Sequence, residues 1–138
     1  PNIPSIKGIP RLFRSTQSFE RAMDMKPSDH HGLKLCLGCF SEMGEDIVEI
    51  VERFGKNNNI IFVHFRDVVG TAEDFHETFV DCGNFNERSA MQALERVGFD
   101  GIVIPDHVPN MIGDTDWGHR ARGYTAGYLR GIIVGLNE

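Results

Sequence analysis

The stretch Ile60-Ile61-Phe62-Val63-His64-Phe65-Arg66 decides the fold. It is a near-continuous apolar run, as expected for a strand of a parallel sheet that is covered on both faces. Because side chains alternate across a strand, His64 and Arg66 share one face, opposite the apolar side chains of Val63 and Phe65. The stretch therefore predicts a buried strand with two polar side chains at its carboxyl end.

Strands and helices are expected to alternate on both sides of this run. The expected strands are 33–37, 60–65 and 101–104, and the expected helices start at Ser15 or lie within 45–54, 84–97 and 124–136. Such an order is typical of βαβ units, which form a parallel sheet with right-handed crossovers. The sequence thus predicts an α/β fold, in one domain over residues 1–138.

Residues 1–14 contain three prolines and a glycine, and we expect an extended lead-in that cannot be helical. The 138 residues are well short of the roughly 250 residues of a closed eight-fold α/β barrel. A partial fold is therefore one of the expectations.

The composition excludes two classes of partner. The chain is 41% hydrophobic with a formal net charge of -6; it has no basic cluster for nucleic acid and no apolar stretch near the roughly 20 residues that cross a bilayer. Three cysteines (Cys36, Cys39 and Cys82) are an odd number, which suits a reducing compartment better than a disulfide framework. We expect a cytoplasmic protein.

Three residues that could carry chemistry come at the carboxyl ends of three successive expected strands. Cys36 points away from the leucines of 33–37, His64 lies near the end of the second strand, and Asp106 follows the third strand. The carboxyl ends of parallel strands meet at one edge, where α/β folds place their sites. A thiolate, an imidazole and a carboxylate together predict a site for Mn, Fe, Co or Zn rather than Ca or Mg. Each residue alone has a plainer interpretation, as a buried thiol, a core histidine or a turn.

Other motifs are weaker. Cys36-Leu37-Gly38-Cys39 has the C-x-x-C spacing of redox and zinc sites, but there is no second such pair, and the motif is expected to close a strand rather than to open a helix. Cys82, among apolar neighbours, is expected to be structural. The glycines between 118 and 131 lack the order that binds a dinucleotide, and Gly127 and Gly131 are expected to pack closely against a strand.

A polar loop near the carboxyl end is a candidate to cover a polyol substrate. Its residues are Asp114, Asp116, Trp117, His119 and Arg122.

Five short blocks also resemble mannonate dehydratase, in that family's order over essentially all of the chain. The blocks are Ile6-Lys7-Gly8-Ile9-Pro10-Arg11, Leu35-Cys36-Leu37-Gly38, Val63-His64-Phe65-Arg66, Pro105-Asp106-His107 and Gly123-Tyr124-Thr125-Ala126-Gly127. The resemblance implies a xylose-isomerase-like TIM barrel and the dehydration of D-mannonate, a sugar acid, to 2-keto-3-deoxy-D-gluconate. It also implies a divalent metal, usually manganese, held by Cys, two His and Asp.

Carried over to this sequence, the family's metal ligands fall on Cys36, His64 and Asp106. His107 and Tyr124 would be the acid/base pair, in roles left open, and Arg66 would be a candidate to bind the substrate carboxylate. Arg122, in the polar loop, is the second residue expected to bind substrate. In the family another ligand histidine lies in an upstream His-Pro-Asp-Asp motif, and this chain is expected to start just after it, at Pro1. About half a barrel, with three of four ligands and no turnover by itself, is the expectation.

Two alternatives remain open. One is a sugar isomerase on the same barrel, although such sites usually use carboxylate-rich ligation. The other is a non-catalytic half-barrel that hides its sheet edges by forming a homo-oligomer.

Overall fold

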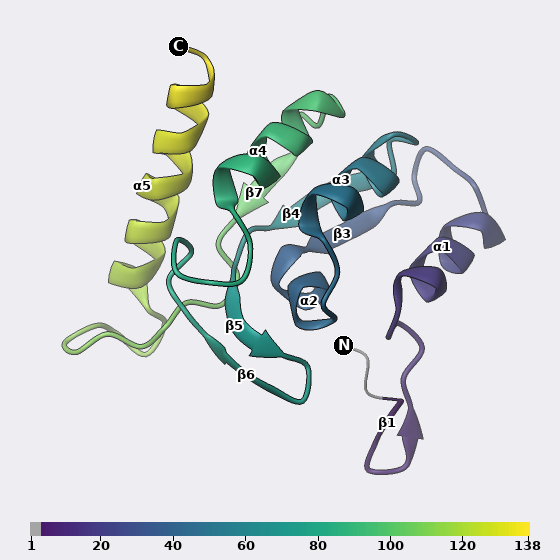
Figure 1. Ribbon diagram of the computed structural model, residues 1–138, viewed down its shortest axis with the longest axis horizontal. Coiled ribbons are helices and arrows are strands. Elements are labelled where there is room, and N and C mark those ends of the chain that lie inside the picture. The colour runs from purple at the N-terminus through teal and green to yellow at the C-terminus, as the bar shows by residue number, and fades with distance from the viewer. Residues whose placement is uncertain (1–3) are drawn as a thin grey trace.

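The computed structural model describes residues 4–138, and the first three residues of the expected lead-in lie outside the described part. Twelve elements follow one another along the chain (Figure 1). The strands are β1 (Ser5–Ile6), β2 (Ile9–Pro10), β3 (Leu33–Cys36), β4 (Ile60–His64), β5 (Val68–Thr71), β6 (Asp74–Glu77) and β7 (Ile102–Ile104). The helices are α1 (Thr16–Met25), α2 (Leu37–Glu42), α3 (Ile47–Gly55), α4 (Glu87–Arg96) and α5 (His119–Leu136).

The central sheet has the order β3-β4-β7, and both pairings are parallel. Cys36 pairs with His64, and His64 in turn pairs with Ile104. The prediction of parallel βα units around the 60–66 run is thereby confirmed. The register also sets the last residues of the three strands beside one another.

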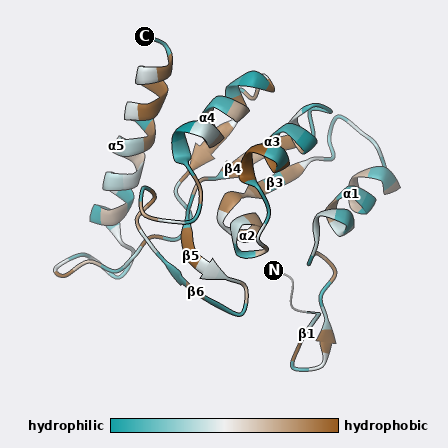
Figure 2. Cartoon of the chain, in the orientation of Figure 1, coloured by the Kyte–Doolittle hydropathy of each residue, from teal (hydrophilic) through white to brown (hydrophobic). Residues whose placement is uncertain are grey.

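One face of this sheet is covered by helices α3 and α4, with α5 packed beside α4 (Figure 1). Asp46 and Asn86 accept the backbone N–H groups of Glu49 and Ser89, so side-chain caps start α3 and α4. The fully buried side chains of this layer come from the strands, from α2 and from the inner sides of the helices: Leu35, Leu37, Val51, Val63, Phe65, Ala90 and Ala93. Figure 2 shows hydrophobic colour along β4, whereas β6 and much of α1 are hydrophilic.

The opposite face of the sheet is open in the described chain, which corrects the expectation that both faces are covered. Ile102 is 63% exposed and Ile104 36% exposed. They share this face with Cys36 and His64, because paired residues of neighbouring strands point the same way. The candidate chemistry thus lies on the uncovered face, at its carboxyl edge.

Four local expectations need correction. Residues after Pro4 are not simply extended, because β1 and β2 pair as a hairpin through Lys7 and Gly8, both with positive φ. The C-x-x-C motif does open a helix, since α2 starts at Leu37. A second hairpin, β5–β6, was not expected from the sequence.

The last helix is the fourth correction. It starts at His119 rather than at Tyr124, because the carboxylate of Asp114 accepts the backbone N–H groups of Arg120 and Ala121 and so caps the first turn. His119 and Arg122 are therefore helical and not part of a loop. None of the helices in residues 4–138 is both long and apolar enough to cross a membrane.

Candidate metal centre

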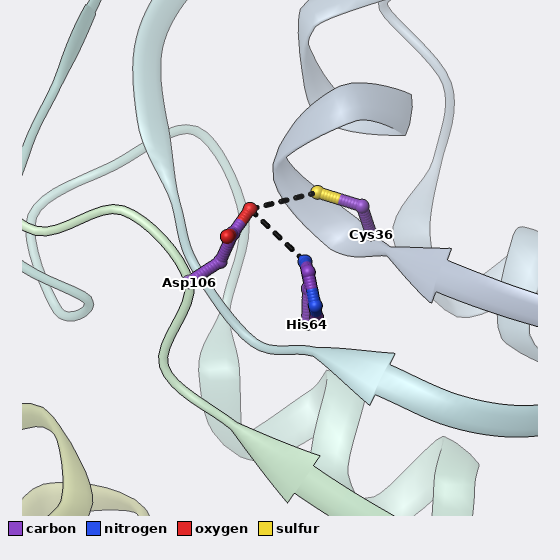
Figure 3. Close-up of side chains that lie close together, drawn as sticks. All are labelled: Cys36, His64 and Asp106. Carbon is purple, nitrogen blue, oxygen red and sulfur yellow. Dashed lines mark hydrogen bonds and ion pairs between the residues drawn. The ribbon is translucent and has the colours of Figure 1, made fainter.

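Cys36, His64 and Asp106 converge at the carboxyl edge of the central sheet. Cys36 ends β3, His64 ends β4, and Asp106 follows β7 after Pro105. Figure 3 shows the three side chains pointing toward one another. One potential ligand atom from each lies within 4.8 Å of the other two, so that a single ion could contact all three.

The polar atoms of this cluster fit a metal ion. His64 Nδ1 lies 3.0 Å from Asp106 Oδ2, yet it is buried without an aligned hydrogen-bond partner. The Cys36 thiol points at the same oxygen, with Sγ 3.8 Å away. A buried nitrogen without a partner is costly, and coordination of a cation by nitrogen, sulfur and oxygen together would satisfy it.

Arg66 lies beneath this cluster and is only 5% exposed. Its guanidinium donates to Glu42 at 2.6 Å and to Glu77 at 2.8 and 3.0 Å, and its Nε lies 3.5 Å from Asp106 Oδ2. Because these contacts occupy the guanidinium inside the protein, they favour a role in holding the carboxylates over the expected contact with a substrate carboxylate. A Cβ at Gly38 would lie 2.8 Å from Arg66, so glycine leaves the space for this side chain.

The two thiols of the C-x-x-C motif differ in their surroundings. The neighbouring Cys36 thiol lowers the pKa of Cys39 despite its burial, and the charge of Arg66 adds to the effect. The same interaction between the two thiols, together with burial, raises the pKa of Cys36. Only Cys36 belongs to the cluster with His64 and Asp106 among the described residues.

His107 is beside the cluster and 61% exposed in its side chain. Its Nδ1 lies 2.8 Å from Glu77 Oε1, and its Nε2 lies 4.0 Å from Asp106 Oδ1. It is therefore close to the candidate ligands and open to a substrate.

Tyr124 lies with a different set of residues, on the first turns of α5. Its hydroxyl donates to Asp81 at 2.7 Å, and its ring contacts Phe79 and Tyr128. This hydrogen bond raises the pKa of Tyr124 to about 12. The phenol is thereby held in its protonated form.

Arg122 holds the segment that carries Asp106. Its NH1 donates to the carbonyl oxygen of Asp106 at 2.6 Å, and its Nε donates to that of Trp117 at 2.9 Å. The guanidinium also lies 4.8 Å from the centre of the Trp117 ring.

Two structural interpretations from the sequence are wrong. Cys82 is exposed, with its thiol toward the Asp81 carboxylate, rather than packed in a core. Gly127 and Gly131 do not lie against a strand, because a Cβ at either position would meet no atom within 4 Å.

Sequence reasoning missed three carboxylates that organise the site: Glu42, Glu77 and Asp81. Glu42 is 3% exposed, and its position on a short helix gave no sign of burial. Glu77 was missed with its hairpin. A buried arginine such as Arg66 needs acidic partners, and this requirement was the one signal in the sequence that pointed to nearby carboxylates.

Comparison with known proteins gives one consistent family. The model of the D-mannonate dehydratase (UxuA) family matches residues 1–138. The mannonate dehydratase of Thermotoga neapolitana is 34% identical over 97% of this chain, and that of Oceanobacillus iheyensis is 31% identical over 96%. The chain spans 38% and 39% of these two relatives.

Solved structures agree with the fold. The crystal structure of mannonate dehydratase from Streptococcus suis serotype 2 matches with a TM-score of 0.86 and 27% identity over 93% of this chain and 39% of that one. A D-tagatose 3-epimerase-like protein matches with a TM-score of 0.72 at 21% identity, over 99% of this chain and 46% of that one, which shows a shared fold alone. The parallel βα units are those of a partial TIM-type barrel. Because the family model matches residues 1–138, which is all of the given sequence, this chain belongs to the mannonate dehydratase family.

Proposed function

We propose that these residues serve a metal-dependent hydro-lyase that converts D-mannonate to 2-keto-3-deoxy-D-gluconate. The family match over residues 1–138 supports the reaction class. The observation that carries the proposal is the convergence of Cys36, His64 and Asp106 within 4.8 Å at the edge where α/β folds hold their sites. These three side chains are the proposed ligands.

The proposed cofactor is a divalent ion, with Mn²⁺ first and Fe²⁺, Co²⁺ or Zn²⁺ as alternatives. A mixed sulfur, nitrogen and oxygen set suits such ions better than Ca²⁺ or Mg²⁺. When bound, the ion would supply stabilisation of the negative charge that develops on the substrate oxygens.

Dehydration of a sugar acid removes a weakly acidic proton from the carbon beside the carboxylate and hydroxide from the next carbon. The enol that forms relaxes to the 2-keto-3-deoxy acid. One protein group must take the proton, and another must protonate the departing hydroxyl. His107 and Tyr124 are the proposed pair.

The surroundings of His107 and Tyr124 indicate which residue acts as the base and which as the acid. Tyr124 has a pKa of about 12 because it donates a hydrogen bond to Asp81, so at neutral pH it carries the proton that an acid needs. His107 has an exposed ring whose Nε2 makes no hydrogen bond to a described residue. We therefore assign His107 as the base and Tyr124 as the acid.

The two arginines have different proposed duties. Arg66 is buried among carboxylates and supports the site from beneath. Arg122 is partly exposed beside Asp106 and is the better of the two to meet a polar substrate, while it keeps the Asp106 segment in place.

The proposed compartment is the cytoplasm, which the three unpaired cysteines support. The exposed isoleucines of the sheet support association with further polypeptide, in the simplest case as a homo-oligomer. Sizing chromatography coupled to light scattering tests the second point.

The test of function is an assay of D-mannonate with Mn²⁺ and the natural polypeptide that carries these residues. Mass spectrometry should show a product lighter by one water, and His107→Gln should lose most of the turnover. An isomerase would instead give a product of unchanged mass. Unchanged substrate with a fully loaded metal site would overturn the proposal.

A further inference from the structure

Glu77 links the candidate base to the buried part of the site. It ends β6, and its Oε1 lies 2.8 Å from His107 Nδ1. The same carboxylate accepts two hydrogen bonds from Arg66 NH1, at 2.8 and 3.0 Å. One residue of the hairpin thus contacts both His107 and Arg66.

The contact to His107 has a defined direction. A carboxylate oxygen only accepts hydrogen bonds, so Nδ1 of His107 must carry the hydrogen. A neutral imidazole has one N–H, which leaves Nε2 with a free lone pair. Nε2 lies 4.0 Å from Asp106 Oδ1, too far for a hydrogen bond, so this lone pair is available to a substrate.

Glu77 is itself firmly held. Arg66 is 5% exposed, and its other terminal nitrogen donates to Glu42 at 2.6 Å. The hairpin is fixed as well, because the backbone N–H of Ala72 donates to the carbonyl oxygen of Glu42 at 2.8 Å. Hydrogen bonds to buried groups therefore hold the carboxylate that contacts His107.

We propose that Glu77 is the positioning residue of His107. It holds the ring in one orientation and in the Nδ1–H tautomer, so that Nε2 faces the proton to be removed. The role of Glu77 in the reaction rests on the proposed function, whereas the Nδ1–H tautomer of His107 does not depend on that function. Interactions of this kind fix a catalytic histidine in other acid/base sites by the same physical means.

Two variants of Glu77 distinguish loss of its hydrogen bond to His107 from a general disturbance of the fold. Glu77→Gln keeps an oxygen that can accept from Nδ1–H, whereas Glu77→Leu has similar volume and no acceptor. Glu42→Leu is the matched control for Glu77→Leu, because Glu42 contacts Arg66 at 2.6 Å but is not joined to His107 by a hydrogen bond among the described residues. If Glu77 acts only through Arg66, Glu42→Leu and Glu77→Leu should behave alike.

The first measurement is a long-range ¹H–¹⁵N correlation spectrum of the histidine rings in the Zn²⁺-loaded protein, with the His107 signals assigned by their loss in His107→Gln. We expect Nδ1–H for His107 in the wild type, in Glu77→Gln and in Glu42→Leu. In Glu77→Leu we expect the Nε2–H form that free histidine prefers. The wild-type tautomer in a folded Glu77→Leu protein would overturn the proposal, as would an Nε2–H ring in the wild type.

The second measurement is turnover of D-mannonate by the natural polypeptide loaded with Mn²⁺. We expect kcat to fall about 100-fold in Glu77→Leu with little change in KM, and to recover largely in Glu77→Gln, since a positioned base contributes about 10²–10⁴-fold. A changed tautomer with unchanged kcat would overturn the role in the reaction. A wild-type protein that leaves D-mannonate intact would count against the proposed function, and the spectrum would still decide the tautomer.

Discussion

Gly83 leaves the space that the carboxylate of Asp67 occupies. A Cβ at position 83 would lie 2.1 Å from Asp67 Cγ and 2.2 Å from Oδ2. Asp67 is 1% exposed, and it accepts the backbone N–H groups of Val68 at 2.7 Å and Phe85 at 3.2 Å. This contact ties the segment after β4 to the segment that leads into α4.

Gly83→Ala should therefore destabilise the fold. Because backbone and a buried carboxylate must shift, we expect a loss of about 1–3 kcal/mol in the free energy of unfolding, measured in urea. Gly127→Ala is the control: it adds a methyl group to α5 where no atom lies within 4 Å, and it should be neutral or stabilise by up to about 1 kcal/mol. Equal effects of the two changes would contradict the prediction.

Stability should depend on pH through Asp67. Burial raises the pKa of this carboxyl, and hydrogen bonds from Val68 and Phe85 offset only part of the shift. Between the unfolded value of about 3.9 and the raised value in the folded state, the folded protein binds more protons than the unfolded one. This carboxyl therefore contributes stability at low pH that is lost as the pH rises through that window.

Asp67→Asn should remove this contribution. The difference in unfolding free energy between wild type and variant, measured in urea at several pH values from about 3.5 upward, should change in favour of the variant as the pH rises. A difference that stays constant across the window would show that Asp67 titrates alike in both states.

Metal binding should depend on one thiol of the C-x-x-C motif. With Co²⁺ as a probe, the wild type should give the near-ultraviolet absorption of a thiolate bound to cobalt. Cys36→Ser should lose this band and bind Co²⁺ at least about 10-fold more weakly, since even a residue that only orients a ligand can be worth that much. Cys39→Ser should keep the band, because Cys39 does not belong to the three-residue cluster. Loss of the band in Cys39→Ser alone would show that Cys39, and not Cys36, is the ligand.

The phenol of Tyr124 should titrate abnormally. Its hydrogen bond to Asp81 raises the pKa to about 12, so Asp81→Asn should bring the pKa down toward the ordinary value of about 10. The phenolate absorption in an alkaline titration measures the change, and Tyr124→Phe identifies its share, because the chain has one other tyrosine, Tyr128. An unchanged titration in Asp81→Asn would refute the hydrogen bond to Asp81 as the cause of the raised pKa.

The sequence predicted those parts of the fold in which local pattern and tertiary packing agree. The 60–66 run is a strong local signal, and the register then brought Cys36 beside His64 as the strand ends required. The convergence of the three candidate ligands followed from strand order, because parallel strands end at one edge.

The parts that could not be predicted depend on contacts between distant residues. The hairpin β5–β6 turns at Ala72 and Glu73, which lack the Asn-Gly or Asp-Gly signal of a tight turn. Helix α2 has six residues and no side-chain cap, and it is stabilised by burial of Leu37 and Phe40. The roles of Glu42 and Glu77 exist only because Arg66 is buried between them.

The separation of the three candidate ligands along the chain has a consequence for folding. Cys36 and Asp106 are 70 residues apart in sequence, and His64 lies on the strand between them. An ion coordinated by all three would close long loops of the chain. Because it would bind the native state and not the denatured state, it would raise the melting temperature. Removal of the ion by a chelator would then loosen three βα units at once.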